Sequence, residues 1–188
     1  MQRRTLLKSL VGAPFIMMLT RPGRAEQQTG VTMSIEELQK NWKEYLAEGA
    51  DVVLTTEPLQ RSAEEWKQSL TSQQYDVLRR EGTERAFTSP LNDEKRLGVF
   101  VCAGCSLPLF TSAMKFDSGT GWPSFFTTIP GVFSMKKDFK LIWPRTEYHC
   151  VRCGGHHGHV FDDGPPPTGE RWCNNGVALR FIPKAEKA

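Results

Sequence analysis

The stretch Cys102-Ala103-Gly104-Cys105 is the first of two C-x-x-C pairs in this chain, and Cys150-Val151-Arg152-Cys153 is the second. A C-x-x-C turn lets two thiolates converge on one ion, and two such turns complete a tetrahedron around Zn²⁺. The four cysteines therefore predict one closed, structural zinc site that ties residue 102 to residue 153. Two disulfides are the alternative, although adjacent C-x-x-C disulfides are more often redox-active than structural.

A fifth cysteine, Cys173, stands apart from the two pairs and follows a glycine- and histidine-rich stretch at 154–159. A single cysteine with histidines elsewhere in the chain is a candidate nucleophile. It needs activation, because an ordinary thiol with a pKa near 8.5 is mostly protonated at pH 7. Arg171 shares a face with Cys173 if the segment is a strand, and His156 and His159 could supply protons and charge. We therefore expect an electron-rich thiol at position 173.

Other polar and aromatic residues surround these motifs. The run Ser118-Gly119-Thr120-Gly121 is a loop that exposes Trp122, whose indole is a flat apolar plate suited to a methyl group. A buried core tryptophan is the alternative. Asn175 lies on the expected strand face of Cys173, where it could hold a water or an imidazole. His157 is expected to point to solvent, and Arg171 taken alone could be a solvated charge.

The composition, the net charge and the N-terminal segment indicate where the protein acts and which partners it lacks. The 188 residues are 39% hydrophobic, enough for one domain and a removable leader, and the net charge of +3 is too mild for a nucleic-acid footprint. Residues 1–25 combine Arg3-Arg4 with an apolar run at 10–19 and end at Ala25, which resembles a twin-arginine export signal. A general secretory leader and an uncleaved anchor are the alternatives. We expect a periplasmic protein without a permanent membrane anchor.

Local patterns predict the secondary structure. A capping-box pattern, serine or threonine followed three residues later by glutamate or glutamine, occurs three times and predicts three helix starts. The first helix is expected at 34–47 and ends near Gly49. The others are expected to start near 62 and near 71, and the last ends near Gly82. Beyond residue 98 the pattern changes to short β runs between turns. Strands are expected at 98–101, 107–110, 125–129, 139–143, 145–149, 159–161 and 177–182. We divide the chain into a leader (1–25), a helical extension (26–61), a main domain (62–183) and a flexible tail (184–188).

The motifs together resemble one known family. The two C-x-x-C pairs, the segments at 116–125, 153–161 and 171–175, and Asp163-Gly164-Pro165 look like those of methionine-R-sulfoxide reductases of the B family, in the same order and spacing. The likeness runs from about residue 62 to residue 181. It implies a mainly β fold, a zinc-stapled domain of two antiparallel sheets (Mss4-like, or β-tent) with helices on its N-terminal side.

The resemblance also implies a role for each matching residue. Cys173 matches the catalytic nucleophile, and His156, His159 and Asn175 match the polar groups around the sulfoxide oxygen. Trp122 matches the indole that receives the substrate's methyl group. The remaining substrate-pocket positions are matched by Phe161, Asp163 and Arg171. The family's zinc ligands are matched by Cys102, Cys105, Cys150 and Cys153.

The implied activity is reduction of methionine-R-sulfoxide, mainly protein-bound, through a cysteine sulfenic acid, as repair during oxidative stress. The implied partners are oxidised proteins and a thioredoxin-like or other thiol reductant, and we expect a monomer. Thr120 stands where many members carry a resolving cysteine, so we expect an external thiol to complete the reaction. Gly176 and Trp172 also depart from the usual serine and tyrosine.

Two other classes of function fit parts of the sequence. A zinc-ribbon interaction module would make Cys173 incidental and would bind a partner through exposed aromatic residues. A thiol–disulfide oxidoreductase would use its C-x-x-C pairs, and metal-free protein would then gain activity.

Overall fold

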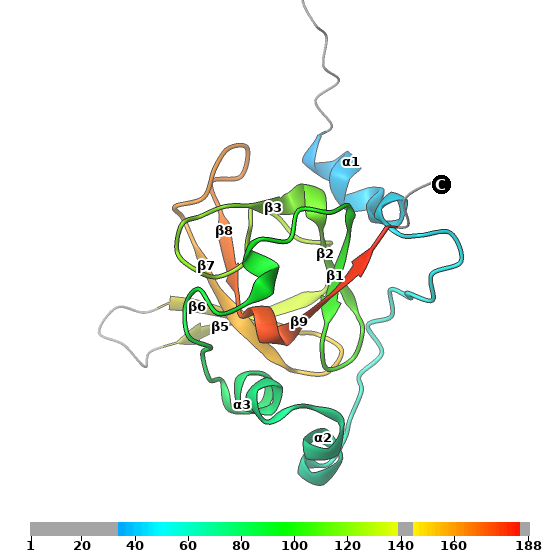
Figure 1. Cartoon of the computed structure of the whole chain (residues 1–188), viewed down its shortest axis with the longest axis vertical. Helices are drawn as coiled ribbons and strands as arrows, with labels where there is room; N and C mark the ends of the chain where they lie inside the picture. Colours follow the sequence, from blue (N-terminus) through cyan, green and yellow to red (C-terminus); the bar gives the residue numbers. More distant parts are fainter. Residues whose placement is uncertain (1–33, 139–144, 185–188) are drawn as a thin grey trace, which may run out of the picture. The chain divides into compact units, whose positions relative to one another are not determined.

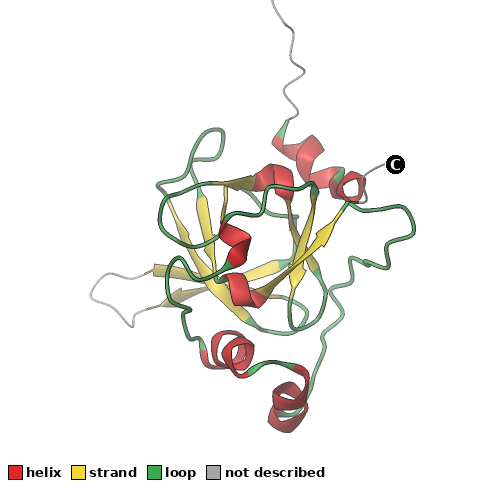
Figure 2. Ribbon diagram, viewed as in Figure 1, coloured by secondary structure: helices red, strands yellow, loops and turns green. Residues whose placement is uncertain are grey.

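Short strands and the loops between them make up most of the residues that the computed structural model describes, which are 34–138 and 145–184 (Figure 2). All of them belong to one structural unit that begins at Met33. The predicted leader, the strand predicted at 139–143 and residues 185–188 of the tail lie outside the described residues. None of the described helices has the length and apolar character needed to cross a bilayer.

Helical elements are few and short. The α-helices are α1 (Ile35–Lys40), α2 (Ala63–Ser69) and α3 (Ser72–Arg80), and the 3-10 helices are η1 (Trp42–Tyr45), η2 (Pro90–Asn92), η3 (Ser112–Met114) and η4 (Gly176–Ala178). The strands are β1 (Gly98–Cys102), β2 (Pro108–Thr111), β3 (Lys115–Phe116), β4 (Ser124–Phe125), β5 (Phe133–Asp138), β6 (Arg145–Cys150), β7 (His156–Phe161), β8 (Arg171–Asn174) and β9 (Leu179–Pro183).

The strands form two antiparallel sheets, which confirms the predicted fold class. The smaller sheet has the order β2-β1-β9, and the larger has the order β3-β4-β8-β7-β6-β5 (Figure 1). An aromatic cluster fills the core between them, where the rings of Phe110 and Phe125 stack 3.9 Å apart and Phe100 meets Phe125 edge-on at 5.1 Å. The core therefore holds β4 and β8, and with them Cys173, against the smaller sheet.

The larger sheet has two chemically different faces, because successive side chains of a strand point to opposite sides. One face carries Tyr148, His157 and Trp172, all buried in the core. The other carries polar groups, among them Glu147 on β6 and its strand partner His159 on β7, which in turn pairs with Cys173 on β8. The candidate catalytic residues thus share the face that points away from the aromatic core.

A β-bulge between β6 and β7 decides which histidines join that face. The register runs Glu147↔His159, then Tyr148↔Gly158, and then skips a residue to His149↔His156. Residues three apart in a regular strand point to opposite sides, but the extra residue of a bulge restores them to the same side. The rings of His156 and His159 accordingly lie 5.5 Å apart.

The helix starts agree with the sequence patterns, and the element ends differ. Capping boxes begin α1, α2 and α3 at Ser34, Ser62 and Thr71. The single helix predicted at 34–47 is α1 followed by η1, with a break at Asn41. α3 ends on Glu81, which takes the left-handed conformation at φ 58°, rather than on Gly82.

The strand predicted at 125–129 is wrong beyond Phe125. The backbone of the next residues leaves the larger sheet, since Phe126 N donates to Met114 O and Ile129 N donates to Leu109 O. The first of these bonds reaches η3 and the second reaches β2 of the smaller sheet, so neither extends the β4–β8 ladder and β4 keeps only two residues.

Candidate active site

The four paired cysteines converge at the turns that follow β1 and β6. The Cys102 and Cys153 Sγ atoms lie 3.6 Å apart and those of Cys105 and Cys150 3.5 Å apart, and all four sulfurs fall within 4.8 Å of one another. A disulfide needs a sulfur–sulfur distance of about 2.05 Å. Tetrahedral bonds of about 2.3 Å to one ion place sulfurs roughly 3.8 Å apart. The cluster therefore fits a single tetrahedral metal ion and not two disulfides.

The surroundings of the four sulfurs also require a cation. All four cysteines are buried. The pKa of Cys102 is raised well above its ordinary value, first by the Cys105 thiol, then by the other two thiols and by burial. Thiolates can gather in such a place only when a metal ion offsets their charge. Arg79 supports the second pair from α3, because its guanidinium donates to Cys153 O at 2.7 Å.

His157 belongs to this cluster, and its predicted exposure to solvent is wrong. The side chain is fully buried, and its Nε2 lies 3.4 Å from Cys102 Sγ. It points to the core because β7 alternates, and the bulge leaves His157 on the side opposite to His156 and His159. An imidazole N–H at this distance donates to a sulfur ligand from outside the four ligands.

Cys173 lies elsewhere, in a pocket of about 110 Å³ on the polar face of the larger sheet. The pocket wall includes Trp122, His159, Phe161 and Asn175 beside Cys173. Sequence-predicted residues from three separate motifs are thus brought together around one sulfur. His156, Asp163 and Arg171 do not line the pocket and stand behind its wall.

The predicted electron-rich thiol at rest is wrong. Burial raises the pKa of Cys173 above its ordinary value, and the opposing effects of the Arg171 charge and the Thr120 hydroxyl do not compensate for it. Desolvation disfavours the thiolate more than one neighbouring cation favours it. Cys173 is therefore protonated near neutral pH in this structure.

Arg171 is fixed from two sides. Its guanidinium donates to both oxygens of Asp163, at 2.8 and 2.9 Å, and lies 4.3 Å from the centre of the Phe161 ring. Hydrogen bonding to Arg171 lowers the pKa of Asp163. Asp163 thus acts on Cys173 through Arg171, by holding the guanidinium in place near the sulfur.

The two histidines on the polar face differ in what they contact. His159 reaches Asp138 through Nε2 at 2.9 Å, and Asp138 also accepts from the Arg145 guanidinium at 2.6 Å. Burial is the largest cause that lowers the pKa of His159, and it also lowers that of His156, to about 3. Both imidazoles are neutral near pH 7, and only His159 lines the pocket.

Asn175 is held by the backbone and does not reach toward an imidazole. Its Oδ1 accepts from Glu84 N at 2.9 Å, and its Nδ2 donates to His157 O at 2.9 Å. The amide thus fixes the edge of the pocket between two segments. The role as a holder of water or imidazole, considered from the sequence, has no support in these contacts.

Sequence reasoning missed Glu84, which ties the pocket together. Its carbonyl accepts from Trp122 Nε1 at 3.2 Å, and its buried carboxylate accepts from Gly176 N at 2.6 Å and Val177 N at 2.9 Å. One loop residue therefore positions the indole, the Asn175 amide and the start of η4. A lone glutamate in a polar loop carries no sequence signal that distinguishes it from a solvated charge.

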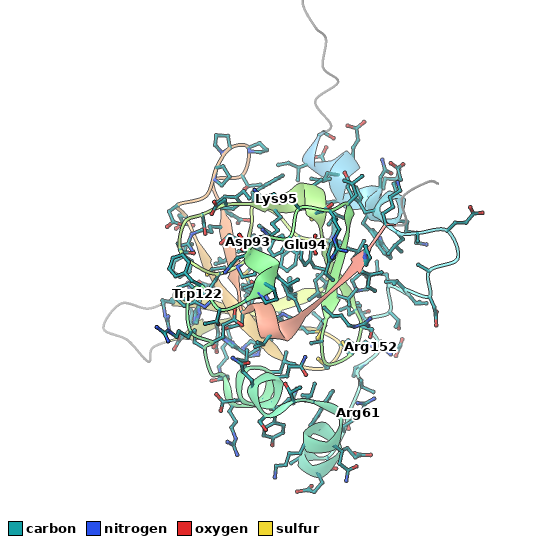
Figure 3. All side chains as sticks on the ribbon, in the orientation of Figure 1. Arg61, Asp93, Glu94, Lys95, Trp122 and Arg152 are labelled. Atoms are coloured by element: carbon teal, nitrogen blue, oxygen red, sulfur yellow. The ribbon has the colours of Figure 1, made fainter. Side chains whose placement is uncertain are left out.

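The position of Trp122 at the edge of the Cys173 pocket depends on the turn at Gly121. Gly121 has φ +88°, and a Cβ there would run into the Phe87 ring. This glycine presents Trp122 at the rim, where it also borders a larger hollow of about 530 Å³ shared with Asp93, Glu94 and Lys95 (Figure 3).

Gly176 and Trp172, which differ from the serine and tyrosine usual in the family that the sequence resembles, can each be explained by the structure. A Cβ at Gly176 would run into the Ser89 hydroxyl, so Ser89 fills the space that a side chain at 176 would occupy. Trp172 points into the core and donates from Nε1 to Glu170 at 2.9 Å. It therefore does not shape the Cys173 pocket.

Known proteins similar to this chain agree with one another. A family model described as the SelR domain matches residues 70–183. The peptide methionine sulfoxide reductase MsrB of Agrobacterium fabrum is 47% identical over 131 residues, which cover 69% of this chain and 97% of that protein. The MsrB of Methanosarcina barkeri is 50% identical over 68% of this chain and 91% of that protein. A chloroplastic relative from Arabidopsis thaliana, peptide methionine sulfoxide reductase B1, is 51% identical over 64% of this chain and 60% of that protein.

Proposed function

The chain belongs to the SelR-domain family of MsrB peptide methionine sulfoxide reductases, and we propose that it reduces the R epimer of methionine sulfoxide in oxidised proteins, with Cys173 as the nucleophile. The single observation that carries the assignment of Cys173 is its position in the 110 Å³ pocket, where it is the only cysteine of the described lining. The other four cysteines are gathered around the metal site.

The pocket offers a distinct contact for each part of a methyl sulfoxide. The indole of Trp122 provides an apolar surface for the methyl group. His159 and Arg145 line the same pocket and face the oxygen. Cys173 approaches the sulfur from the sheet. The R epimer satisfies the three contacts together, whereas the S epimer exchanges two of its substituents and loses at least one contact.

The proposed chemistry is a transfer of one oxygen atom. The Cys173 sulfur attacks the sulfoxide sulfur while the sulfoxide oxygen is protonated, and the thiol proton is the one that has to be moved. This attack forms a bond between the Cys173 sulfur and the methionine sulfur. The protonated oxygen then passes to the Cys173 sulfur as the methionine sulfur–oxygen bond and the sulfur–sulfur bond break, so the products are methionine and a Cys173 sulfenic acid. Because the resting thiol keeps its proton, proton transfer and sulfur attack are coupled, and His159 is the group positioned to pass the proton to the oxygen.

The sulfenic acid is then reduced from outside the chain. Thr120 contacts Cys173 in the place where a resolving thiol would lie. Two external thiols, from a thioredoxin-like protein or a small dithiol, convert the sulfenic acid back to the thiol, forming one disulfide and one water. A zinc-site cysteine could serve instead only at the expense of the metal.

Zinc is the metal that we assign to the four-cysteine site. Four thiolates in tetrahedral array are the donor set that Zn²⁺ favours in structural sites. An ion held by all four sulfurs keeps no open position for substrate, so it would join the two turns and take no part in the reaction.

The place of action follows from residues 1–25 alone. Their paired arginines, apolar run and small residues near Ala25 support export by a twin-arginine route. That route carries folded proteins, so a metal site filled before export would protect four thiols from oxidation outside the cytoplasm. We propose repair of oxidised periplasmic proteins during oxidative stress, by a monomer without a lasting membrane anchor.

One assay tests the proposed activity. Dabsylated methionine-R-sulfoxide and its S epimer are incubated separately with dithiothreitol and with wild-type or Cys173→Ser protein. We expect reduction of the R epimer alone by the wild type, and a loss of at least about a thousandfold in the variant, since the other four cysteines are gathered at the metal site and do not line the pocket. Residual R-epimer activity in Cys173→Ser near the wild-type rate would overturn the proposal. Gain of activity after metal removal would favour a thiol–disulfide oxidoreductase instead.

A further inference from the structure

A second group of metal-binding side chains lies on the polar face, next to the residues that line the pocket. Glu147 and His149 are alternate residues of β6, and His156 is the strand partner of His149 across the bulge. Their ligand atoms all lie within 4.8 Å of one another. None of these three side chains contributes to the Cys173 pocket.

The geometry of the three groups suits one ion. His149 Nε2 lies 3.4 Å from Glu147 Oε1, and His156 Nδ1 lies 3.5 Å from Glu147 Oε2. Ligands bound tetrahedrally at about 2.0–2.1 Å are roughly 3.3 Å apart. The observed separations are therefore close to those of a filled site, although the groups are too poorly aligned for hydrogen bonds to one another.

The same atoms lack partners. Glu147 Oε2, His149 Nε2 and His156 Nδ1 are buried and make no hydrogen bond to any described residue. Glu147 and His156 are each only 1% exposed. Buried polar atoms are normally paired, because an unpaired one loses its hydrogen bonds to water without replacement. Three orphaned atoms this close to one another indicate a partner that is not among the described residues.

The tautomer of His149 also favours a cation. Its Nδ1 lies 3.3 Å from Gly154 O, which can only accept, so the hydrogen is on Nδ1 and the Nε2 lone pair is free.

We propose that Glu147, His149 and His156 form a second site for a divalent transition metal of the Zn²⁺ class, with two imidazole nitrogens and one carboxylate as ligands. Two imidazoles and a glutamate are a donor set that Zn²⁺ accepts with a fourth position left for water. The site joins β6 to β7 across the bulge, separate from the four-cysteine site and from Cys173. It goes beyond the proposed reductase activity and does not depend on it.

Lys136 controls access to this site. Its ammonium lies 3.1 Å from Glu147 Oε1 and 3.3 Å from Glu81 Oε1, while its side chain is 62% exposed. An exposed lysine can swing into solvent with little cost, which opens a path to the carboxylate. Because its positive charge competes with a metal ion for Glu147, its removal should tighten binding.

Metal stoichiometry tests the proposal without reference to activity. Protein with the four-cysteine site filled is dialysed against Zn²⁺ in molar excess, and bound zinc is counted by elemental mass spectrometry. We expect two ions per chain for the wild type and for Cys173→Ser, one for His149→Gln, and two with several-fold tighter binding of the second for Lys136→Met. Circular dichroism verifies that each variant is folded, and Glu147→Gln provides a second loss variant that should also bind one ion.

The outcomes separate the possibilities. A single ion in the wild type at saturation would overturn the site. So would a second ion that persists in both His149→Gln and Glu147→Gln, or one that disappears in Cys173→Ser, since either would place it elsewhere.

Discussion

The four paired cysteines are buried and Cys173 is half-buried, so both sulfur centres are shielded from solvent, yet the groups around them differ. Around Cys102 the neighbours are three further thiols and the His157 ring, and the Arg79 guanidinium donates to the backbone carbonyl of Cys153. Around Cys173 the neighbours are the Arg171 guanidinium, the Thr120 hydroxyl and a small pocket. The comparison teaches that burial alone does not decide whether a cysteine binds a metal ion or acts as a nucleophile. Four crowded thiols require an ion, whereas one isolated thiol beside a pocket is left for a substrate.

The largest effect should follow from breaking the metal centre. We expect Cys102→Ser to lose the zinc of the four-cysteine site and to fail to fold stably. Structural zinc contributes an apparent ~10–16 kcal/mol in small domains, which exceeds or equals the whole stability of most proteins, about 5–15 kcal/mol. Zinc content and urea unfolding give the measurement. Cys173→Ser is the matched control and should keep both its zinc and its midpoint; equal midpoints for the two serine variants would remove the distinction between the centres.

A smaller effect is expected at the residue that supports the reactive centre. Glu84→Gln replaces a carboxylate that accepts from two backbone N–H groups, so one of them loses its partner. Hydrogen bonds to charged groups contribute about 1.5–3 kcal/mol each, and we predict a fall of about 2–3 kcal/mol in the free energy of unfolding. The exposed Glu57→Gln is the control and should change stability by less than about 0.5 kcal/mol. If both variants unfold alike, Glu84 does not support the pocket.

The smallest effect concerns the charge beside Cys173. Burial already raises the pKa of this thiol, and Arg171 opposes the rise. The rate of alkylation by iodoacetamide should therefore keep increasing as the pH passes 9, where an ordinary thiol levels off. Arg171→Met should raise the pKa further and slow labelling at pH 8 by up to about tenfold, since one pKa unit changes the thiolate fraction tenfold.

Arg80→Met, on the exposed surface of α3, is the control for this measurement and should label at the wild-type rate. A labelling curve for the wild type that levels off below pH 8 would contradict the account of Cys173 as a resting thiol. It would restore the electron-rich sulfur expected from the sequence.

Local chemistry was the part of the fold that the sequence could predict. The capping boxes at Ser34, Ser62 and Thr71 act within four residues, so their pattern is complete in the sequence. The two C-x-x-C pairs were likewise informative, because four paired thiols can form either one metal site or two disulfides and little else. Strand β5 was missed because its Ser-Met-Lys-Lys centre has no apolar alternation and is exposed along most of its length.

The sequence predicted which residues belong to the candidate site, but not where their side chains point or which groups they contact. The side to which His156, His157 and His159 point depends on one skipped residue between β6 and β7, and a bulge of this kind leaves no mark in the sequence. The role of Glu84 depends on backbone groups more than 90 residues away. The resting charge of Cys173 depends on how deeply β8 is buried, which only the packed structure supplies.

The most direct test of the two-centre account is a single turnover. Reduced, zinc-loaded protein is mixed with one equivalent of methionine-R-sulfoxide peptide in the absence of any thiol, trapped with dimedone and analysed by mass spectrometry, with zinc counted in parallel. The account predicts one dimedone adduct, at Cys173, with the zinc of the four-cysteine site fully retained. A disulfide between Cys173 and any of the other four cysteines, accompanied by release of that zinc, would contradict it.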